Sequence, residues 1–165
     1  AFEPVLNRAL FPTASSLRDF YDSFANNIFQ AIEHGNQLGI TIGNTIVNNV
    51  DTNKIRACLG KIVITPQGEL TACSRLSSPK ESYYADFFYG KATAVEGFVI
   101  DSARYDAIIS QNVNSYSECK SCLAKYHCSG GCLLARKILP NDYIDAYCCF
   151  NREMVKRVLL SKIGK

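Results

Sequence analysis

Apolar side chains recur at three- and four-residue steps in two stretches, one near each end of the chain. The first stretch contains Leu17, Phe20, Tyr21, Phe24, Ile28, Ala31 and Ile32, and the second contains Met154, Val155, Val158 and Leu159. This spacing predicts two amphipathic helices. We expect Ser15 or Ser16 to cap the first helix and Gly35 or Gly39 to end it, and we expect the second helix to start at the pair 148–149.

Strand signals lie between the two predicted helices. Residues 40–50, ITIGNTIVNNV, are rich in β-branched side chains and predict a short strand and a loop. Residues 61–72, KIVITPQGELTA, predict a β-hairpin with PQG as its turn. Residues 98–100 predict another short strand, followed by a short helix after Asp101, and CLLARKIL predicts one or two helical turns that stop at Pro140. These elements together predict an α+β fold.

Composition narrows the class of protein only moderately. The 165 residues are 47% hydrophobic and 20% charged, which is typical of a folded chain of about one domain. The net charge of +3 is small and scattered, so we expect no nucleic-acid partner. No stretch approaches the roughly eighteen apolar residues of a membrane helix, and no signal peptide is recognisable, so we expect a cytoplasmic protein without a membrane partner. The missing initiator Met indicates a piece of a longer chain.

The eight cysteines carry the candidate chemistry. The segment C-x2-C-x5-C-x3-C contains Cys119, Cys122, Cys128 and Cys132, and the remaining four are Cys58, Cys73, Cys148 and Cys149. Clustered cysteines in a reducing compartment usually indicate a metal site or catalysis. Because His34 and His127 are the only histidines, any metal would be held almost wholly by thiolate, as in zinc, Cu(I) or iron–sulfur sites.

Local context favours iron–sulfur clusters without excluding zinc or disulfides. Residues 129–131, SGG, separate Cys128 from Cys132, and such small residues let backbone N–H groups approach sulfide or thiolate. The predicted hairpin should also bring Cys58 and Cys73 together, since they flank its two ends. Arg136 is expected to face water, or otherwise to offset the negative charge of a cluster.

The full cysteine pattern resembles a known family. It runs from Cys58 through Gly68 to Cys73, then through C-x2-C-x5-C-x3-C to Cys148. This order and spacing resemble the seven-cysteine signature of the SPASM domain, the C-terminal auxiliary-cluster extension of many radical S-adenosylmethionine enzymes that modify peptides. YGKATAVEGFVID and CSGGC also resemble that domain. Residues 51–165 would then form the SPASM domain, and residues 1–50 the last helix–strand unit of a preceding partial barrel.

The resemblance implies two auxiliary 4Fe–4S clusters. By position, the first cluster would be held by Cys58, Cys73 and Cys132, and the second by Cys119, Cys122, Cys128 and Cys148. Cys149 is the alternative last ligand, or else a small buried hydrophobic residue. Some relatives have a further cysteine where this chain has Thr52, so the first cluster would have an iron open to water, to a side chain such as Asp51, or to a substrate thiolate.

The resemblance also implies a function. The domain would transfer electrons or bind the peptide substrate in an enzyme that matures either ribosomally synthesised peptides or sulfatases. The chain has no C-x3-C-x2-C motif, so S-adenosylmethionine would bind only in the missing barrel, and we expect no catalytic residue and no activity from this chain alone. Expected partners are a peptide or protein substrate, the enzyme's own N-terminal radical domain, and an electron donor such as flavodoxin or ferredoxin. The alternatives are a zinc-binding structural or interaction module and a free-standing iron–sulfur electron carrier.

Overall fold

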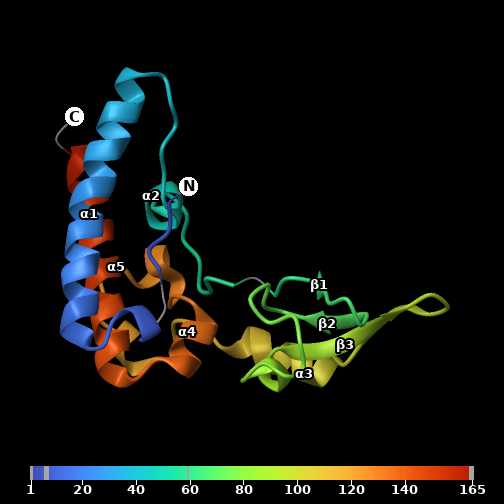
Figure 1. Ribbon diagram of the computed structural model, residues 1–165. Coiled ribbons are helices and arrows are strands. Elements are labelled where there is room, and N and C mark those ends of the chain that lie inside the picture. The colour runs from blue at the N-terminus through green and yellow to red at the C-terminus, as the bar shows by residue number, and fades with distance from the viewer. Residues whose placement is uncertain (1, 6–7, 59, 164–165) are drawn as a thin grey trace.

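The computed structural model describes residues 2–5, 8–58 and 60–163, and it divides into two regions (Figure 1). The helical region comprises α1 (Ala14–Gln37), α2 (Thr45–Asn49), α4 (Leu133–Ile138) and α5 (Asn141–Ile163). The sheet region comprises β1 (Val63–Ile64), β2 (Glu69–Thr71), β3 (Phe88–Thr93), β4 (Gly97–Ile100) and α3 (Ser102–Ser110). The chain is therefore α+β, as its sequence predicts.

The two long helices, α1 and α5, pack side by side and run parallel. Near their first turns, the Tyr143 hydroxyl donates to the carbonyl oxygen of Phe11 at 2.8 Å. Further along, Tyr21 stacks on Phe150 with ring centroids 4.7 Å apart. Later still, Arg157 donates to Asn26 at 2.7 Å. Because two parallel neighbours cannot be joined by a short turn, the chain between them crosses back, and this crossover contains the sheet region.

The periodic pattern of the first helix is confirmed, but its cap is not the residue expected. Thr13 caps α1: its side chain accepts from the Ser16 N–H at 3.1 Å, and Ser16 returns a bond to the Thr13 N–H. Such a reciprocal pair satisfies two donors that a helix start leaves unpaired. Ser16 is thus the partner of the cap rather than the cap itself, and α1 ends at Gln37, in the expected place.

The strand predicted within residues 40–50 is wrong, because part of this segment forms α2. Asn44 caps that helix by accepting a hydrogen bond from the Ile46 N–H at 2.9 Å, and Asn44 is almost fully buried. The four strands among the described residues all lie between positions 63 and 100. A β-branched segment outside that sheet has no neighbouring strand with which to pair, so the Asn44 cap decides the local structure.

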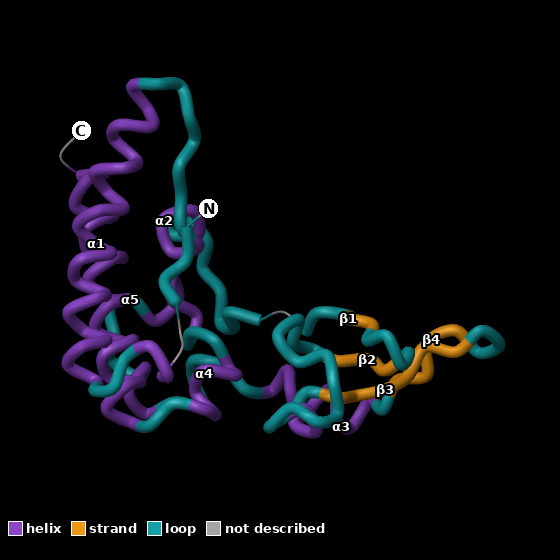
Figure 2. The backbone as a smooth tube through the Cα atoms, viewed as in Figure 1, coloured by secondary structure: helices purple, strands orange, loops and turns teal. Residues whose placement is uncertain are grey.

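The sheet is an antiparallel meander in the order β1-β2-β3-β4 (Figure 2). The predicted hairpin of residues 61–72 is confirmed by β1 and β2, and Gly68 takes the left-handed conformation that its turn needs (φ 76°). The strand predicted at residues 98–100 and the helix after Asp101 are also confirmed, as β4 and α3. The strands are short, and every residue of β4 is exposed.

The last helix starts earlier than its sequence suggested. The predicted turns of α4 end before Pro140, as expected, but α5 begins directly afterwards, at Asn141. The carbonyl oxygen of Pro140 accepts hydrogen bonds from the N–H groups of Tyr143 and Ile144 at 3.1 and 3.0 Å. Cys148 and Cys149 therefore lie about two turns inside the helix rather than at its start. No helix in the described part of the chain is both long and apolar enough to cross a bilayer.

Candidate metal centres

Four cysteine side chains surround one small cavity in the helical region, and we call them the four-thiol group. Its members are Cys119, Cys122, Cys128 and Cys148. Cys119 ends the turn η3 (Ser117–Cys119), and Cys128 lies in η4 (Lys125–Ser129), a single π-helical turn, while Cys148 reaches in from α5. The cavity measures about 20 Å³, which is roughly the room that one water molecule needs. The structure thus brings together the four cysteines that the family resemblance assigns to the second cluster.

Burial and neighbouring sulfur atoms raise the pKa of three thiols in this group, Cys119, Cys128 and Cys148. Burial, followed by the nearby Cys148 and Cys119 thiolates, raises the pKa of Cys128 to about 12. Burial also raises the pKa of Cys119 and that of Cys148. Several buried thiolates at one place repel each other unless positive charge is added. The group therefore suits a cationic centre, whose binding would release these protons.

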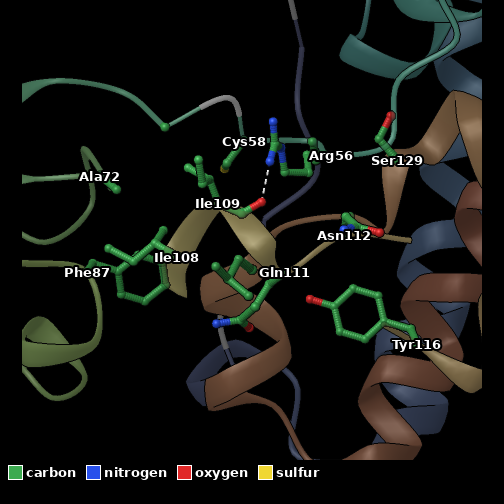
Figure 3. A pocket seen from close by; sticks show the side chains of 14 residues that line it. Arg56, Cys58, Ala72, Phe87, Ile108, Ile109, Gln111, Asn112, Tyr116 and Ser129 are labelled. Carbon is green, nitrogen blue, oxygen red and sulfur yellow. Dashed lines mark hydrogen bonds between the residues drawn. The ribbon is translucent and has the colours of Figure 1, made fainter. Parts of the chain in front are cut away.

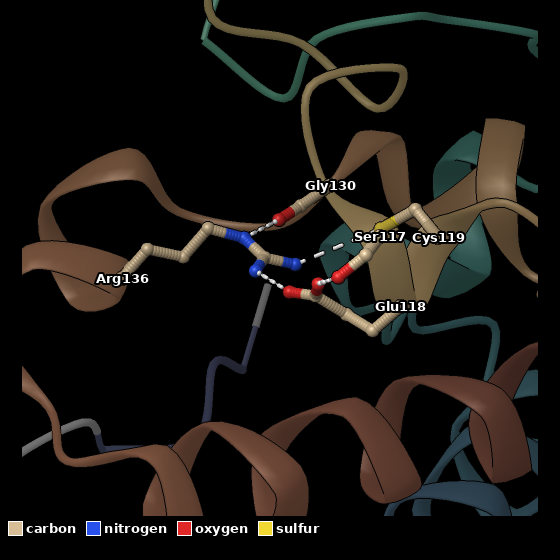
Figure 4. A network of polar contacts seen from close by, with 5 residues as sticks. All are labelled: Ser117, Glu118, Cys119, Gly130 and Arg136. Atoms are coloured by element: carbon tan, nitrogen blue, oxygen red, sulfur yellow. Dashed lines mark hydrogen bonds and ion pairs between the residues drawn. The ribbon is translucent and has the colours of Figure 1, made fainter.

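A largely buried arginine side chain, that of Arg136, already supplies positive charge at this cavity (Figure 4). The Nη2 atom of Arg136 lies 3.8 Å from the Sγ atom of Cys119. The same guanidinium group donates to the Gly130 carbonyl oxygen and to the Glu118 carboxylate, and it stacks on the Tyr116 ring at 3.9 Å. The Arg136 side chain is only 9% exposed, so the expectation that it faces water is wrong. The sequence did contain a signal for this position, because Arg136 follows Cys132 by about one helical turn.

Three further cysteines form a second set, the three-thiol group: Cys58, Cys73 and Cys132. Burial and the Cys132 and Cys73 thiolates raise the pKa of Cys58, and burial and the Cys132 thiolate raise that of Cys73. The ends of the hairpin thus meet near the start of α4, as its geometry predicts. Cys58 also borders a small cavity whose lining includes Phe87 and Ile108 (Figure 3).

Backbone N–H groups support the sulfur atoms of the three-thiol group. The backbone N–H of Leu133 lowers the pKa of Cys58, and the backbone N–H of Arg75 lowers the pKa of Cys73, each in opposition to burial. Such N–H groups favour the thiolate, which is the form that binds metal. These donors lie outside the SGG segment that the sequence had suggested for this role.

The segment 129–131 has a different structural role from the one expected. Ser129, Gly130 and Gly131 all adopt left-handed backbone conformations, with φ of 57°, 79° and 73°. The Gly130 and Gly131 N–H groups donate to the Cys128 carbonyl oxygen rather than to a sulfur atom. A Cβ atom on Gly131 would lie 2.7 Å from the Tyr147 ring. The glycines therefore allow a tight turn against Tyr147, which places Cys128 and Cys132 in different groups.

The other candidate ligands are engaged elsewhere. Cys149 accepts a hydrogen bond from Arg152 at 3.0 Å and is absent from the described lining of the four-thiol cavity, which contains Cys148. Asp51 pairs with Lys162 at 2.5 Å, near the far end of α5. The Thr52 hydroxyl donates to the Asn49 carbonyl oxygen at 2.8 Å.

The cysteines have the donor chemistry of a thiolate-held cluster, but across its described residues the structure does not arrange them as a metal site. All eight cysteines are free thiols. The Asn151 residue borders the four-thiol cavity, and its side-chain nitrogen is buried without a hydrogen-bond partner among the described residues; sulfide or thiolate could accept a hydrogen bond from it. Across residues 2–5, 8–58 and 60–163, no three His, Cys, Asp or Glu side chains are arranged to hold a single metal ion.

The fold and these two groups describe an α+β protein with paired cysteine sites. Comparisons of the chain with protein families, with curated proteins and with solved structures found no match. The functional argument therefore starts from the thiol groups and the charges beside them.

Proposed function

We propose that this chain binds two iron–sulfur clusters and is the auxiliary-cluster domain of a peptide-modifying radical S-adenosylmethionine enzyme. One observation supports the proposal: of seven cysteines dispersed from position 58 to position 148, four line one cavity, while Cys132 borders a cavity with Cys58 and packs against the core that contains Cys73. The first cluster would be held by Cys58, Cys73 and Cys132. The second would be held by Cys119, Cys122, Cys128 and Cys148. This division agrees with the one that the SPASM resemblance implies.

The residues around the thiols suit a redox site. Bound clusters would supply one-electron transfer at potentials set by ligand charge, hydrogen bonds and burial. Arg136 and Arg152 both lie at the four-thiol cavity, where their charges offset those of the thiolates. At the three-thiol group, the backbone N–H groups of Leu133 and Arg75 favour the thiolate forms of Cys58 and Cys73. The two sites thus stabilise negative sulfur by different means.

The wider setting belongs to the same proposal. The domain would work in the cytoplasm beside its own N-terminal radical domain, with a peptide or protein substrate and an electron donor such as flavodoxin or ferredoxin. Support for this setting is the cysteine pattern alone. The chain itself would hold no S-adenosylmethionine site.

Anaerobic reconstitution tests the cofactor directly. We expect brown protein with broad absorption near about 400 nm, and about eight iron and eight sulfide per chain if both sites hold 4Fe–4S clusters. A chain that binds one or two zinc ions and no sulfide would contradict the proposal and support a zinc-binding module. An upstream C-x3-C-x2-C motif in the same reading frame would distinguish an enzyme domain from a free-standing electron carrier.

Paired cysteine variants test the assignment of ligands. Cys122→Ser should reduce the iron content from about eight to about four per chain, because one of two four-iron sites loses a ligand. Cys149→Ser is the matched control and should retain all of the iron, since Cys149 is bonded to Arg152 instead. Loss of iron in Cys149→Ser with retention in Cys148→Ser would exchange the last ligand.

A further inference from the structure

We propose that the outer edge of β4 binds an extended segment of the peptide substrate as an additional strand of the sheet. This inference rests on the proposed function, because it takes a peptide to be the substrate of the enzyme. The site is a row of backbone groups rather than a pocket. It lies in the β3–β4 hairpin, which projects away from α1 and α5 (Figure 2).

The register of the sheet directs backbone groups of β4 toward the free edge. The Asp101 N–H donates to the Tyr89 carbonyl oxygen at 2.7 Å, in register with the ladder between β4 and β3. Since hydrogen-bonded and non-hydrogen-bonded pairs alternate along an antiparallel ladder, the backbone of Val99 faces β3, whereas Phe98 and Ile100 face away from it. Because β4 is the outermost strand, these two residues present two N–H and two C=O groups to an incoming strand.

The same edge is apolar and unprotected. The side chains of Phe98, Val99 and Ile100 belong to residues that are 55%, 45% and 45% exposed. Sheets usually protect an open edge with a charged residue, a proline or a bulge, because a bare edge pairs with other chains. The four residues of β4 include no charge and no proline, and their register with β3 is regular. The edge is therefore suited to the addition of a strand.

The length of the edge favours a peptide over a second copy of this chain. A stable interface between two proteins usually takes about 20–30 residues from each side. β4 has four residues, and only two of them direct hydrogen-bonding groups outward. Such an edge is too short to hold two copies together, whereas an added peptide strand needs only main-chain bonds and contacts for alternate side chains. The expected occupant is an extended peptide.

The side chains beside the edge define the chemistry of that peptide. Lys91 lies opposite Val99 on the same face of the sheet, is exposed, and takes part in none of the ion pairs between described residues. Glu69, opposite Lys91 on β2, accepts from the Tyr84 hydroxyl at 2.7 Å. A peptide residue opposite Val99 would be two strands, about 10 Å, from Lys91, a span that lysine and glutamate side chains bridge together. The preferred sequence is therefore apolar, acidic, apolar.

A short probe peptide with blocked backbone donors tests the main-chain bonds. The probe is fluorescein-labelled TVEVT, and fluorescence anisotropy measures its binding to the anaerobically reconstituted chain. With the glutamate opposite Val99, the valine N–H groups face β4 and the threonine N–H groups face away. N-methylation of both valines should weaken binding by about tenfold or more, whereas N-methylation of both threonines should change it by less than about twofold. Equal weakening by the two methylated peptides would overturn the added strand.

Variants of the chain test the residues of the edge. Lys91→Ala should weaken binding about two- to fivefold, and the probe TVQVT should lose as much. Both changes together should cost no more than either one, because they remove one interaction; additive losses would overturn the role of Lys91. Ile100→Pro removes an outward N–H but no bond to β3, so it should weaken binding about fivefold or more. Leu160→Ala, an exposed apolar residue on α5, is the control and should bind the probe unchanged.

The outcomes separate this inference from the proposed function, because iron and sulfide are measured on the same samples. Protein that holds its clusters but fails to bind the probe at about 1 mM would overturn the docking edge and leave the cluster assignment in place. Protein that takes up no cluster would overturn the proposed function and, with it, the substrate role of any bound peptide. A wild-type dimer that Ile100→Pro converts to a monomer would assign the edge to a second copy and overturn this inference.

Discussion

The helical and sheet regions differ in the size of their apolar cores. Among the described residues, the core of the helical region contains fourteen buried side chains, contributed mainly by helices α1 and α5, each longer than twenty residues. The core of the sheet region contains nine, beneath strands of two to six residues. A short sheet with a small core is marginal by itself, whereas long packed helices are not. The comparison indicates that the sheet region depends more heavily on what its cysteines bind.

The two regions meet at the segment between Cys128 and Cys132. Cys132 packs against both apolar cores, while Cys128 packs only against that of the helical region among the described residues. If each cysteine serves a different cluster, the segment between them ties the hairpin to the helices. Metal binding would then be coupled to the docking of one region on the other.

Removal of the clusters should have the largest effect, and the effect should be unequal. After a chelator strips the reconstituted protein, amide hydrogens of β1, β2 and β3 should lose nearly all protection from exchange, because little apolar burial remains to hold them. Amides in the middle of α1 and α5 should stay protected. Hydrogen exchange followed by mass spectrometry measures both at once. Equal loss in the two regions would break the comparison.

Truncating the two cores should sharpen the same contrast. Met154 on α5 and Leu70 on β2 are both fully buried, and each change to Ala should cost about 2–5 kcal/mol locally. Met154→Ala should shift the global urea transition, because α5 packs along α1. Leu70→Ala should mainly increase the hydrogen-exchange rates of amides in the sheet. The control Leu160→Ala, on the exposed side of α5, should stay within about 0.5 kcal/mol.

The turn that joins the regions should tolerate no side chain at position 131. Gly131→Ala places a Cβ atom against Tyr147 and requires a left-handed backbone, which together should cost about 2–4 kcal/mol. Gly39→Ala is a matched control, since Gly39 has a similar φ of 69° but no described atom within 4 Å of the new Cβ atom. It should lose only about 1–2 kcal/mol. If urea denaturation gave the same loss of unfolding free energy for both variants, the contact with Tyr147 would not explain the effect at position 131.

The smallest effect concerns an ion pair on α5. The Arg157 guanidinium group holds the pKa of Glu153 below its ordinary value, so the pair stabilises the folded state above the unfolded pKa of about 4.3, and this contribution is lost as the pH falls through the lower folded pKa. Because Glu153 is 39% exposed, Glu153→Gln should cost only about 0.3–0.5 kcal/mol at pH 7. The difference from the wild type should disappear at acid pH; a difference that grows there would reverse the sign.

Much of the fold could be predicted because its signals are local. The 3.6-residue period of α1, the hairpin turn at Gly68 and the stop at Pro140 each depend on a few neighbouring residues. The strand prediction for residues 40–50 failed because β-branched composition gives only a local preference, whereas a strand also needs a neighbouring strand with which to pair. The prediction placed the start of α5 too late although a signal was present, because Tyr143, Phe150 and Met154 already recur at helical spacing.

The sequence by itself determined that the chain is α+β, that it carries two amphipathic helices, and that its cysteines are spaced for thiolate ligation. Only the tertiary structure decided that Arg136 lies against Cys119, that Cys149 accepts from Arg152, and that Gly131 turns against Tyr147. The physical reason is range. Helix periods and turns depend on residues within a few positions, whereas the surroundings of a side chain depend on segments that only the folded chain brings together.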